Sequence, residues 1–597
     1  MPTNRHTPCI LLLMAFVAGC GDTQKSSPSH VATAANGGYG GNHTPSSSGT
    51  GGASPTGGVN TVAGTSTGDV PIDPYPRTHA DPKLTKALAT GEIVLVGEGS
   101  SACTNESPAS SDRWCAFARG PKDGPQSLWV VNVTLAAADD AVPCDKEGPT
   151  CIKLTDNLWT GEDLWGPSHP RIHRFDGDTL IFYADAGEPV REPYAGPIFA
   201  WRPGWAEGRR LTNDEGVVCV GHKRRPLVYC LQSLDVEARD PTDFGGPIWR
   251  AFDLYAGSLE LPDAPLSLVE RLTLSTDQQW AFRASFDRKG ERLAYSSVKE
   301  DGEQESLRFV STSSLGEGSP ATVLADASQW VLSHDGGAVY ALRGFGGEGY
   351  VGELVVADFP SGENQHVVSA GVSHIDPAGK DDDPTSDEDR GVGYDLSTDA
   401  GEAFEFLTDR AMPGATRRVG DAVSGPRVSA TGTHTMLFQQ STSGWPVARV
   451  FDNATGKGCT LNREYSAETY NGRFFSDSKR VVWIEYGSGG SEVGYSADVA
   501  CGSLVKFGDW VLGYSLHRDF VVFEGGDEAD STSYLQYARL PAKDGTSSVT
   551  PLVVVEHPRY PLPTVDLDQG GYIVFAGQFG MPGVAGLYLH GPLEASF

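Results

Sequence analysis

The stretch of sequence that decides the fold is SFDRKGERLAYSSVKEDGEQESLRFVSTSS, at Ser285–Ser314. It opens with a turn at Asp287–Gly290, which leads into the apolar run RLAYS at Arg292–Ser296. A polar loop follows, and a second apolar run, SLRFV, occupies Ser306–Val310. Short apolar runs bounded by Gly, Asp and Ser are typical of strands joined by turns. The stretch therefore predicts a turn followed by two antiparallel strands.

Copies of this unit recur along most of the chain at intervals of about 40–65 residues, a period that is typical of propeller blades. Examples are RFDGDTLIFYAD from Arg174 and LSHDGGAVYALR from Leu332. Further copies begin at Ser110, Leu396, Val428, Phe475 and Asp566, and weaker ones lie near Lys223 and His517. Beyond about Gly91, no segment keeps a helical 3.6-residue period over three turns. The chain is therefore expected to be all-β.

The repeats resemble the TolB-type, WD40-like propeller repeat, which has a Ser-Pro-Asp-Gly-like turn, an aliphatic or aromatic strand, a loop and a second strand ending near Asp-x-x-x-Gly. The resemblance covers residues 90–597, although the Pro of the turn is absent from every copy and Trp-Asp dipeptides do not mark the blades. It implies a single β-propeller of about seven or eight four-stranded blades, placed at residues 73–597. Each sheet would bury both apolar faces by radial stacking. Two smaller propellers or sandwiches are the alternative.

The N-terminus, MPTNRHTPCILLLMAFVAGC, is typical of an export signal. Arg5 and His6 precede the apolar run Ile10–Val17, which is too short to span a bilayer core of about 30 Å. The segment ends in VAGC, which resembles the lipobox of bacterial lipoproteins. This resemblance implies a lipoprotein signal peptide at residues 1–19 and acylation of Cys20. An ordinary secretory signal with a chance cysteine is the alternative.

Residues 20–72 begin with this cysteine and continue as a linker rich in Gly, Ser, Thr, Ala and Asn. Such a segment cannot bury enough apolar surface to offset its ordering entropy, so a disordered tether is expected. Gly21 stands where inner-membrane lipoproteins of enteric bacteria have Asp. The resemblance therefore implies an outer-membrane lipoprotein of the bacterial cell envelope, facing the periplasm or the cell surface. The membrane is an expected partner through the lipid anchor.

The charge of the chain excludes one class of partner. Its 46 Lys and Arg residues against 77 Asp and Glu residues give a formal net charge of −31. Nucleic-acid binding depends on neutralising phosphates with Lys and Arg, so no nucleic-acid partner is expected. The short basic turn His222–Arg225 is interpreted as ordinary surface chemistry.

The chain has ten cysteines, of which Cys9 and Cys20 belong to the N-terminal segment. The even number that remains in an exported chain is typical of disulfides. The sequence alone does not fix their connectivity, but close spacing favours the pairs Cys103–Cys115, Cys144–Cys151, Cys219–Cys230 and Cys459–Cys501. Metal binding is the alternative, but it would require CxxC-type pairs with His nearby, and the sequence lacks such pairs.

The acidic stretch Asp376–Gly391 is a weak candidate for a calcium site. Asp383, Thr385, Asp387 and Asp389 alternate in a way that could offer oxygens to Ca²⁺, with the three Asp residues as the candidate ligands. The stretch lacks the Gly and the Glu that an EF-hand loop has at fixed positions, so a solvated loop between strands is the favoured interpretation. No other cofactor is expected.

Aromatic and histidine residues give two further candidates. The four tryptophans between 159 and 205 could stack on sugars or peptides, but packing between blades is favoured; they are Trp159, Trp165, Trp201 and Trp205. His169 and His173 are separated by Pro170, which forbids the helix that would align them on a metal.

The sequence contains no motif that assigns a catalytic residue. It has no G-x-S-x-G elbow placed between a strand and a helix, and it lacks an H-E-x-x-H zinc motif, a P-loop and a dinucleotide fingerprint. We therefore expect a β-propeller that serves as a binding or scaffold module for protein, peptide or glycan partners of the envelope. The alternative is a surface-anchored enzyme acting on polysaccharide or another extracellular substrate through carboxylates near the propeller axis.

Overall fold

The computed structural model describes residues within 114–590, with gaps of which the larger are 133–147, 159–172, 185–196, 235–248 and 378–389. Over the described residues the chain forms antiparallel β-strands and one short 3-10 helix, η1 (Thr312–Ser314). This part of the chain holds no helix that is long and apolar enough to cross a membrane. The expected signal peptide, Cys20 and the linker at 20–72 lie outside the described residues.

The N-terminal half of the described chain forms four sheets, each made of strands that are consecutive in the sequence. The first two contain β1 (Trp114–Arg119), β2 (Gln126–Asn132) and β3 (Cys151–Leu158), then β4 (His173–Asp176), β5 (Thr179–Tyr183), β6 (Ile198–Trp201) and β7 (Arg209–Arg210). The next two contain β8 (Gly216–Gly221), β9 (Leu227–Ser233), β10 (Trp249–Ser258) and β11 (Ser267–Ser275), then β12 (Ala284–Phe286), β13 (Arg292–Val298), β14 (Glu305–Ser311) and β15 (Ala321–Ala325).

The C-terminal half begins with a seven-stranded sheet and continues with smaller ones. The large sheet contains β16 (Gln329–Leu332), β17 (Ala338–Gly346), β18 (Val351–Asp358), β19 (His366–Pro377), β20 (Val392–Thr398), β21 (Gly401–Leu407) and β22 (Thr416–Asp421). The next sheet contains β23 (Ser424–Val428), β24 (His434–Gln440), β25 (Pro446–Asp452) and β26 (Gly458–Thr460). The one after it contains β27 (Glu468–Phe474), β28 (Arg480–Tyr486), β29 (Glu492–Asp498) and β30 (Val505–Asp509). The last two contain β31 (Gly513–His517), β32 (Phe520–Asp527), β33 (Thr532–Arg539) and β34 (Val549–Val555), then β35 (Thr564–Leu567), β36 (Gly570–Gly577) and β37 (Gly586–His590).

The stretch that predicted the fold forms the hairpin that was expected. The N–H of Gly290 donates to the carbonyl of Asp287 at 2.8 Å and closes the turn between β12 and β13. The predicted runs Arg292–Ser296 and Ser306–Val310 lie within β13 and β14, which pair antiparallel. Consecutive antiparallel strands recur in the other described sheets, so the repeat predicted from the sequence is a structural repeat.

Strand β19 belongs to two repeat units at once. Its first half pairs with β18, where Val372 lies opposite Gly352, and its second half pairs with β20, where Val372 lies opposite Leu396. Gly371, with a positive φ of 76°, lies at the junction of the two halves. Strand β19 therefore ends one four-stranded unit and begins the next. Counted in this way, the described strands form ten units of three or four strands.

This number exceeds the seven or eight blades that the sequence predicted. The weaker copies near Lys223 and His517 form complete hairpins, β8–β9 and β31–β32, in sheets of four strands. A weak match to the repeat thus reflects substitutions in the turn rather than a missing unit.

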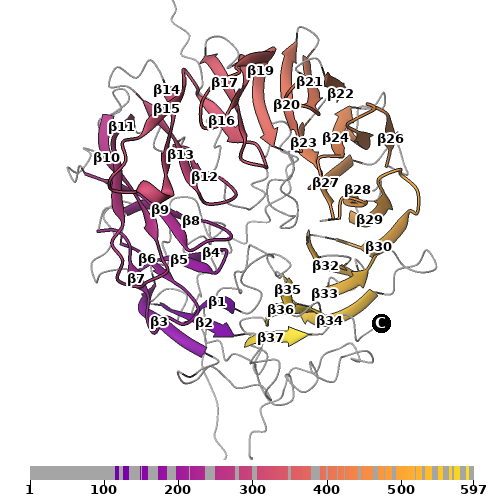
Figure 1. The fold of residues 1–597 in the computed structure, drawn as a ribbon. Coiled ribbons are helices and arrows are strands. Elements are labelled where there is room, and N and C mark those ends of the chain that lie inside the picture. The colour runs from indigo at the N-terminus through magenta and orange to yellow at the C-terminus, as the bar shows by residue number, and fades with distance from the viewer. Residues whose placement is uncertain are drawn as a thin grey trace, which may run out of the picture.

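The units follow one another round a ring, with the first and last sheets near each other in the view of Figure 1. Neighbouring sheets bury their apolar faces against each other. The cluster between β1–β3 and β4–β7 includes Leu128, Phe175 and Trp201, and the cluster between β23–β26 and β27–β30 includes Met436 and Trp483. Burying a large apolar side chain of this kind contributes about 1.5–3 kcal/mol. The expected all-β propeller is therefore confirmed.

Candidate functional site

The turns that join the first two strands of successive units pack against one another on one side of the ring. Gly177, between β4 and β5, has φ +62°, and a Cβ at this position would lie 2.3 Å from the carbonyl oxygen of Lys223 in the next turn. The N–H of Gly221 donates to Asp176 Oδ2 at 2.8 Å. We call this surface the turn face and define it by the described residues of six turns, at 176–179, 222–226, 287–291, 333–337, 429–433, and 475 with 477–479.

His222 joins the second of these turns to the third. Its Nδ1 atom accepts hydrogen bonds from the backbone N–H groups of Arg224 and Arg225, each at 2.9 Å. Because Nδ1 is an acceptor, the ring proton lies on Nε2, which donates to the carbonyl oxygen of Asp287 at 3.1 Å. The ring also lies edge-on to Phe286, with the centroids 5.8 Å apart. One buried side chain therefore fixes both the shape of its own turn and its distance from the next.

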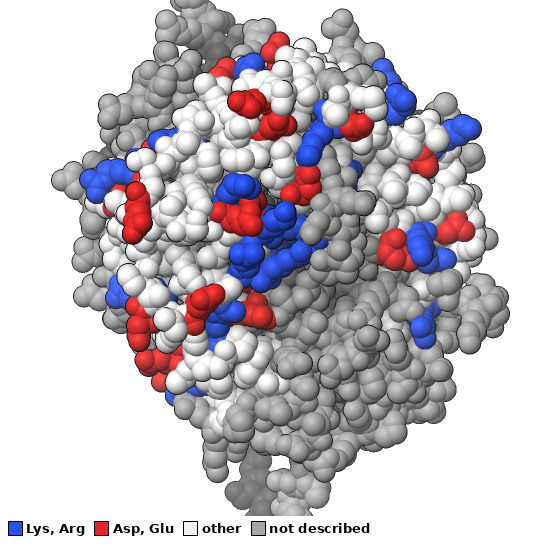
Figure 2. All heavy atoms as spheres, viewed as in Figure 1, with Lys and Arg blue, Asp and Glu red and all other residues white. Residues whose placement is uncertain are grey.

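These two turns carry a group of cations that we call the basic cluster, consisting of Lys223, Arg224, Arg225, Arg288 and Lys289. Arg224, Arg225 and Lys289 are exposed, and the other two are half-buried. A Cβ on Gly290 would lie 2.8 Å from Cδ of Arg225, so the Arg225 side chain passes directly over the neighbouring turn. Figure 2 shows Lys and Arg side chains gathered near the middle of the visible face, next to the inner ends of the sheets of β8 and β12 in Figure 1, with acidic side chains around them.

Carboxylates on the turn face hold the turns in shape. Asp287 Oδ1 accepts from the N–H groups of Glu291 at 2.7 Å and Arg292 at 3.2 Å, and its Oδ2 lies 3.3 Å from Arg292 Nη1. Asp335, in the next turn, binds both terminal nitrogens of Arg410 at 2.8 and 2.9 Å. Burial opposes ionisation of Asp335, but hydrogen bonds from Arg410, Ser333 and the Gly337 N–H outweigh it and lower the pKa to about 2.

The pKa of His222 is lowered from its ordinary value, chiefly because burial disfavours the charged ring. The hydrogen bonds to the Asp287 and Arg288 backbone and the charge of Asp287 oppose this shift, whereas the charge of Arg225 adds to it. Protonation would also place a hydrogen on Nδ1, where two N–H groups already point. His222 therefore holds the two turns together in its neutral form.

We expect acid to weaken the fold through His222. The unfolded chain binds this proton near the ordinary pKa of 6.5, whereas the folded chain binds it only at lower pH. The free energy of unfolding therefore falls as the pH drops below about 6.5, by at most about 1.4 kcal/mol per pH unit for one proton. In His222→Asn the side-chain oxygen can still accept hydrogen bonds from the N–H groups of the turn, but the side chain does not titrate. The free energy of unfolding of this variant should therefore fall less between about pH 7 and pH 5 than that of the wild type. Urea unfolding at a series of pH values measures both slopes, and equal slopes would contradict this role.

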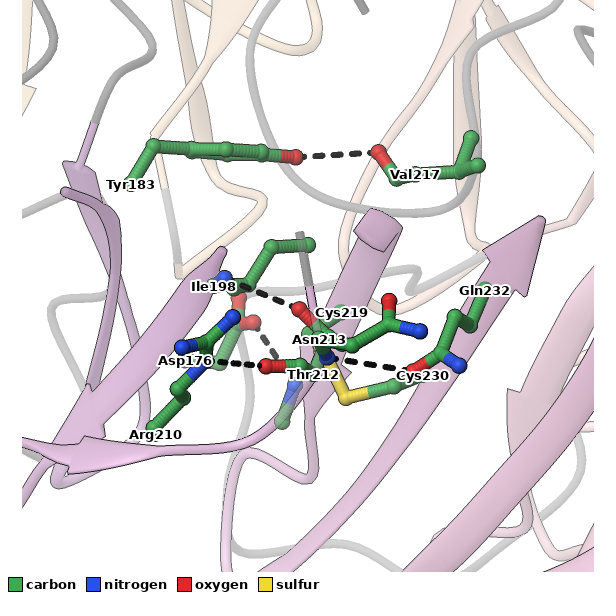
Figure 3. Close-up of a disulfide and its surroundings, with 11 residues drawn as sticks. Asp176, Tyr183, Ile198, Arg210, Thr212, Asn213, Val217, Cys219, Cys230 and Gln232 are labelled. Atoms are coloured by element: carbon green, nitrogen blue, oxygen red, sulfur yellow. Dashed lines mark hydrogen bonds between the residues drawn. A yellow bond between two sulfur atoms is a disulfide. The ribbon is translucent and has the colours of Figure 1, made fainter. Parts of the chain in front are cut away.

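The disulfide between Cys219 and Cys230 lies within the β8–β9 hairpin, whose turn carries the first three cations of the basic cluster. It joins residues that face each other in β8 and β9, with Cα atoms 4.1 Å apart (Figure 3). Beside it, the Tyr183 hydroxyl of β5 donates to the carbonyl of Val217 in β8 at 3.1 Å. The hairpin is thus fixed covalently within its own sheet and by hydrogen bonding to the preceding one.

The second disulfide, between Cys459 and Cys501, joins β26 to the turn after β29 and so links two neighbouring sheets. Both observed bonds are pairs that the spacing favoured.

Cys115 and Cys151 are also disulfide-bonded. They lie two strands apart, on either side of Val131, which is too far for a bond to each other. Their partners therefore lie outside the described residues, as do Cys103 and Cys144.

The structure places the remaining candidates as follows. Trp201 is fully buried and donates from Nε1 to the Trp205 carbonyl at 3.0 Å, so it packs in the core, as favoured from the sequence. His173 begins β4. The other tryptophans, His169 and the calcium candidates lie outside the described residues; they are Trp159, Trp165, Asp383, Asp387 and Asp389. Among the described residues, no group of three or more His, Cys, Asp or Glu side chains could hold a metal ion.

No family model matches the chain, and neither does any curated protein. Among solved structures, the chain is similar to a eukaryotic initiation factor at 10% identity and a TM-score of 0.39, over 72% of this chain and 94% of that one. It is also similar to the β-propeller domain of the Trilobed protease from Pyrococcus furiosus, at 11% identity and a TM-score of 0.27 over 55% and 92% of the two chains. The chain is also similar to TolB from Acinetobacter baumannii, at 13% identity and a TM-score of 0.22, over 55% of this chain and 80% of that one. Because these scores are all below 0.5, the propeller assignment rests on the sheet topology.

Proposed function

We propose that the chain is a binding module that presents its turn face to a partner from the bacterial outer membrane, where an acylated Cys20 holds it. Propellers support many functions, so the fold alone does not decide between them. The observation that carries the proposal is the construction of the turn face. His222 and Gly177 hold successive turns against each other, the Asp335–Arg410 pair ties a further turn to the loop after β21, and the basic cluster lies on this face. A surface that is rigid before binding loses little entropy when a partner arrives.

Three carboxylates of the turn face also favour binding over catalysis. An enzyme acting on polysaccharide needs two carboxyl groups with pKa values pushed apart, one of them raised. On the turn face, Asp176, Asp287 and Asp335 instead accept hydrogen bonds that hold the turns, and the pKa of Asp335 is lowered to about 2. These three side chains are therefore suited to supporting a surface.

The proposal is tested by photo-crosslinking in cells that produce the full chain. A photoreactive residue replaces Ala411, which is exposed beside the Asp335 turn, or Arg417, which is exposed on the outer strand β22. We expect a discrete crosslinked product from position 411 and none from position 417. The product from 411 should be lost in Cys20→Ala, and that variant should move from the membrane to the soluble fraction. The same pattern at both positions would contradict a role for the turn face, and membrane retention of Cys20→Ala would contradict the anchor.

A further inference from the structure

The basic cluster concentrates positive charge on a strongly acidic protein. Its five cations lie on two turns that His222 and Gly290 bring into contact, while the whole chain carries a formal net charge of −31. Clustered cations create a local positive potential, which attracts anions. Asp287 lies on the second of these turns, where its oxygens are engaged with Glu291 and Arg292. The arrangement therefore suits an anionic partner from outside the chain.

The geometry of the cluster is set before any partner arrives. The backbone N–H groups of Arg224 and Arg225 are fixed by Nδ1 of His222, and the Cys219–Cys230 disulfide anchors the same hairpin. The Arg225 side chain lies over Gly290, where a side chain on the neighbouring turn would displace it. Guanidinium groups carried on a backbone fixed in this way can form paired hydrogen bonds with carboxylates or sulfates.

We propose that the basic cluster binds an acidic polysaccharide, whose carboxylates pair with the guanidinium and ammonium groups of the two turns. This inference rests on the proposed binding function and names the chemistry of the partner. A segment of a flexible linear polymer can contact the patch of cations locally, although acidic side chains lie around that patch in Figure 2. A flat anionic membrane would be brought against those acidic side chains as well, and like charges repel.

The distribution of apolar surface favours a glycan over a protein partner. Protein interfaces depend on a few buried aromatic or aliphatic anchors. The described large hydrophobic side chains that are exposed lie outside the two turns; they are Leu261, Leu268, Val367, Met412 and Tyr486. A polyanionic glycan needs no such anchor, because charge-assisted hydrogen bonds along the polymer supply the affinity.

The test compares two pairs of neighbouring arginines in the full-length, detergent-solubilised protein. Arg224→Gln/Arg225→Gln removes two exposed charges from the cluster, and Arg417→Gln/Arg418→Gln removes two exposed charges from β22. Binding to polygalacturonate is measured by calorimetry at low salt, and thermal unfolding confirms that both variants fold. We expect the first variant to weaken binding at least tenfold and the second to change it less than twofold. Lys289→Gln alone should weaken binding severalfold, and added salt should weaken the wild type more than the first variant.

Three results would overturn the inference. They are no binding of polygalacturonate by the wild type, equal losses in the two double variants, and tighter binding of polyglutamate or of phosphatidylglycerol vesicles than of polygalacturonate. The last result would assign the cluster to an acidic protein segment or to a membrane. Each of these outcomes is separable from the proposed function, because crosslinking from Ala411 reports on the turn face at a position outside the basic cluster.

Discussion

Gly177→Ala is expected to destabilise the protein by about 2–5 kcal/mol, from left-handed backbone strain together with overpacking. Gly177 has φ +62°, a conformation that costs a residue with a Cβ about 1–2 kcal/mol. The added Cβ would also lie 2.3 Å from the carbonyl oxygen of Lys223, which belongs to the backbone of the next turn. Backbone atoms cannot rotate away as a side chain can, so one of the two turns must shift.

Gly204→Ala is the matched control for this substitution. Gly204 also has a positive φ, of 92°, but no atom lies within 4 Å of the position that its Cβ would take. Backbone strain alone should then lower the free energy of unfolding, by about 1–2 kcal/mol. Urea unfolding of both variants beside the wild type separates strain from the contact between turns. Equal losses in the two variants would show that the turns do not depend on each other.

Loss of the Cys459–Cys501 disulfide is expected to be the second large effect. The bond closes a loop with a sequence separation of 42, against 11 for Cys219–Cys230. In the chain-entropy model these separations correspond to about 4 and about 3 kcal/mol of stability respectively. The longer bridge also joins two sheets, and both of its cysteines pack on the apolar cluster that those sheets share. Its removal should therefore loosen a contact between units, whereas removal of the shorter bridge affects one hairpin.

The measurement is urea unfolding of Cys459→Ala/Cys501→Ala and Cys219→Ala/Cys230→Ala, each beside the oxidised wild type. Single replacements are avoided because they would leave a reactive thiol. Reductant should lower the wild-type midpoint at least as far as either double variant. A double variant at residues 459 and 501 that is as stable as the wild type would mean that packing alone holds the two sheets together.

The repeat was the part of the fold that the sequence could predict. Turn residues and apolar runs are local signals, and Asp287–Gly290 with the strands after it lies where the pattern placed it. The copy taken to begin at Leu396 is out of phase. Its apparent opening turn joins β20 to β21, which are the second and third strands of their unit, because β19 supplies the first. Pairing of one strand with two neighbours is a long-range property that a local pattern does not contain.

The sequence indicated only the first of the two turns that carry the basic cluster. The run His222–Arg225 stood out as basic, but Arg288 and Lys289 lie more than sixty residues away along the chain. The repeat itself contained the missing signal, because turns at equivalent positions of successive units become neighbours in a ring. The contact of His222 with Asp287 could not be read in this way. It depends on the burial of one ring between two backbones, which only the packed structure defines.

The sharing of β19 between two units makes one seam of the ring unlike the other described seams. At the other described seams, neighbouring sheets meet chiefly through side chains, with one isolated backbone bridge, Leu158–Ala184, between the first two sheets. At Val372 a single residue pairs with β18 on one side and with β20 on the other, with a register shift beside each pairing. Opening this seam would break backbone hydrogen bonds as well as side-chain contacts. We therefore expect the ring to open first at a seam where mainly side chains meet.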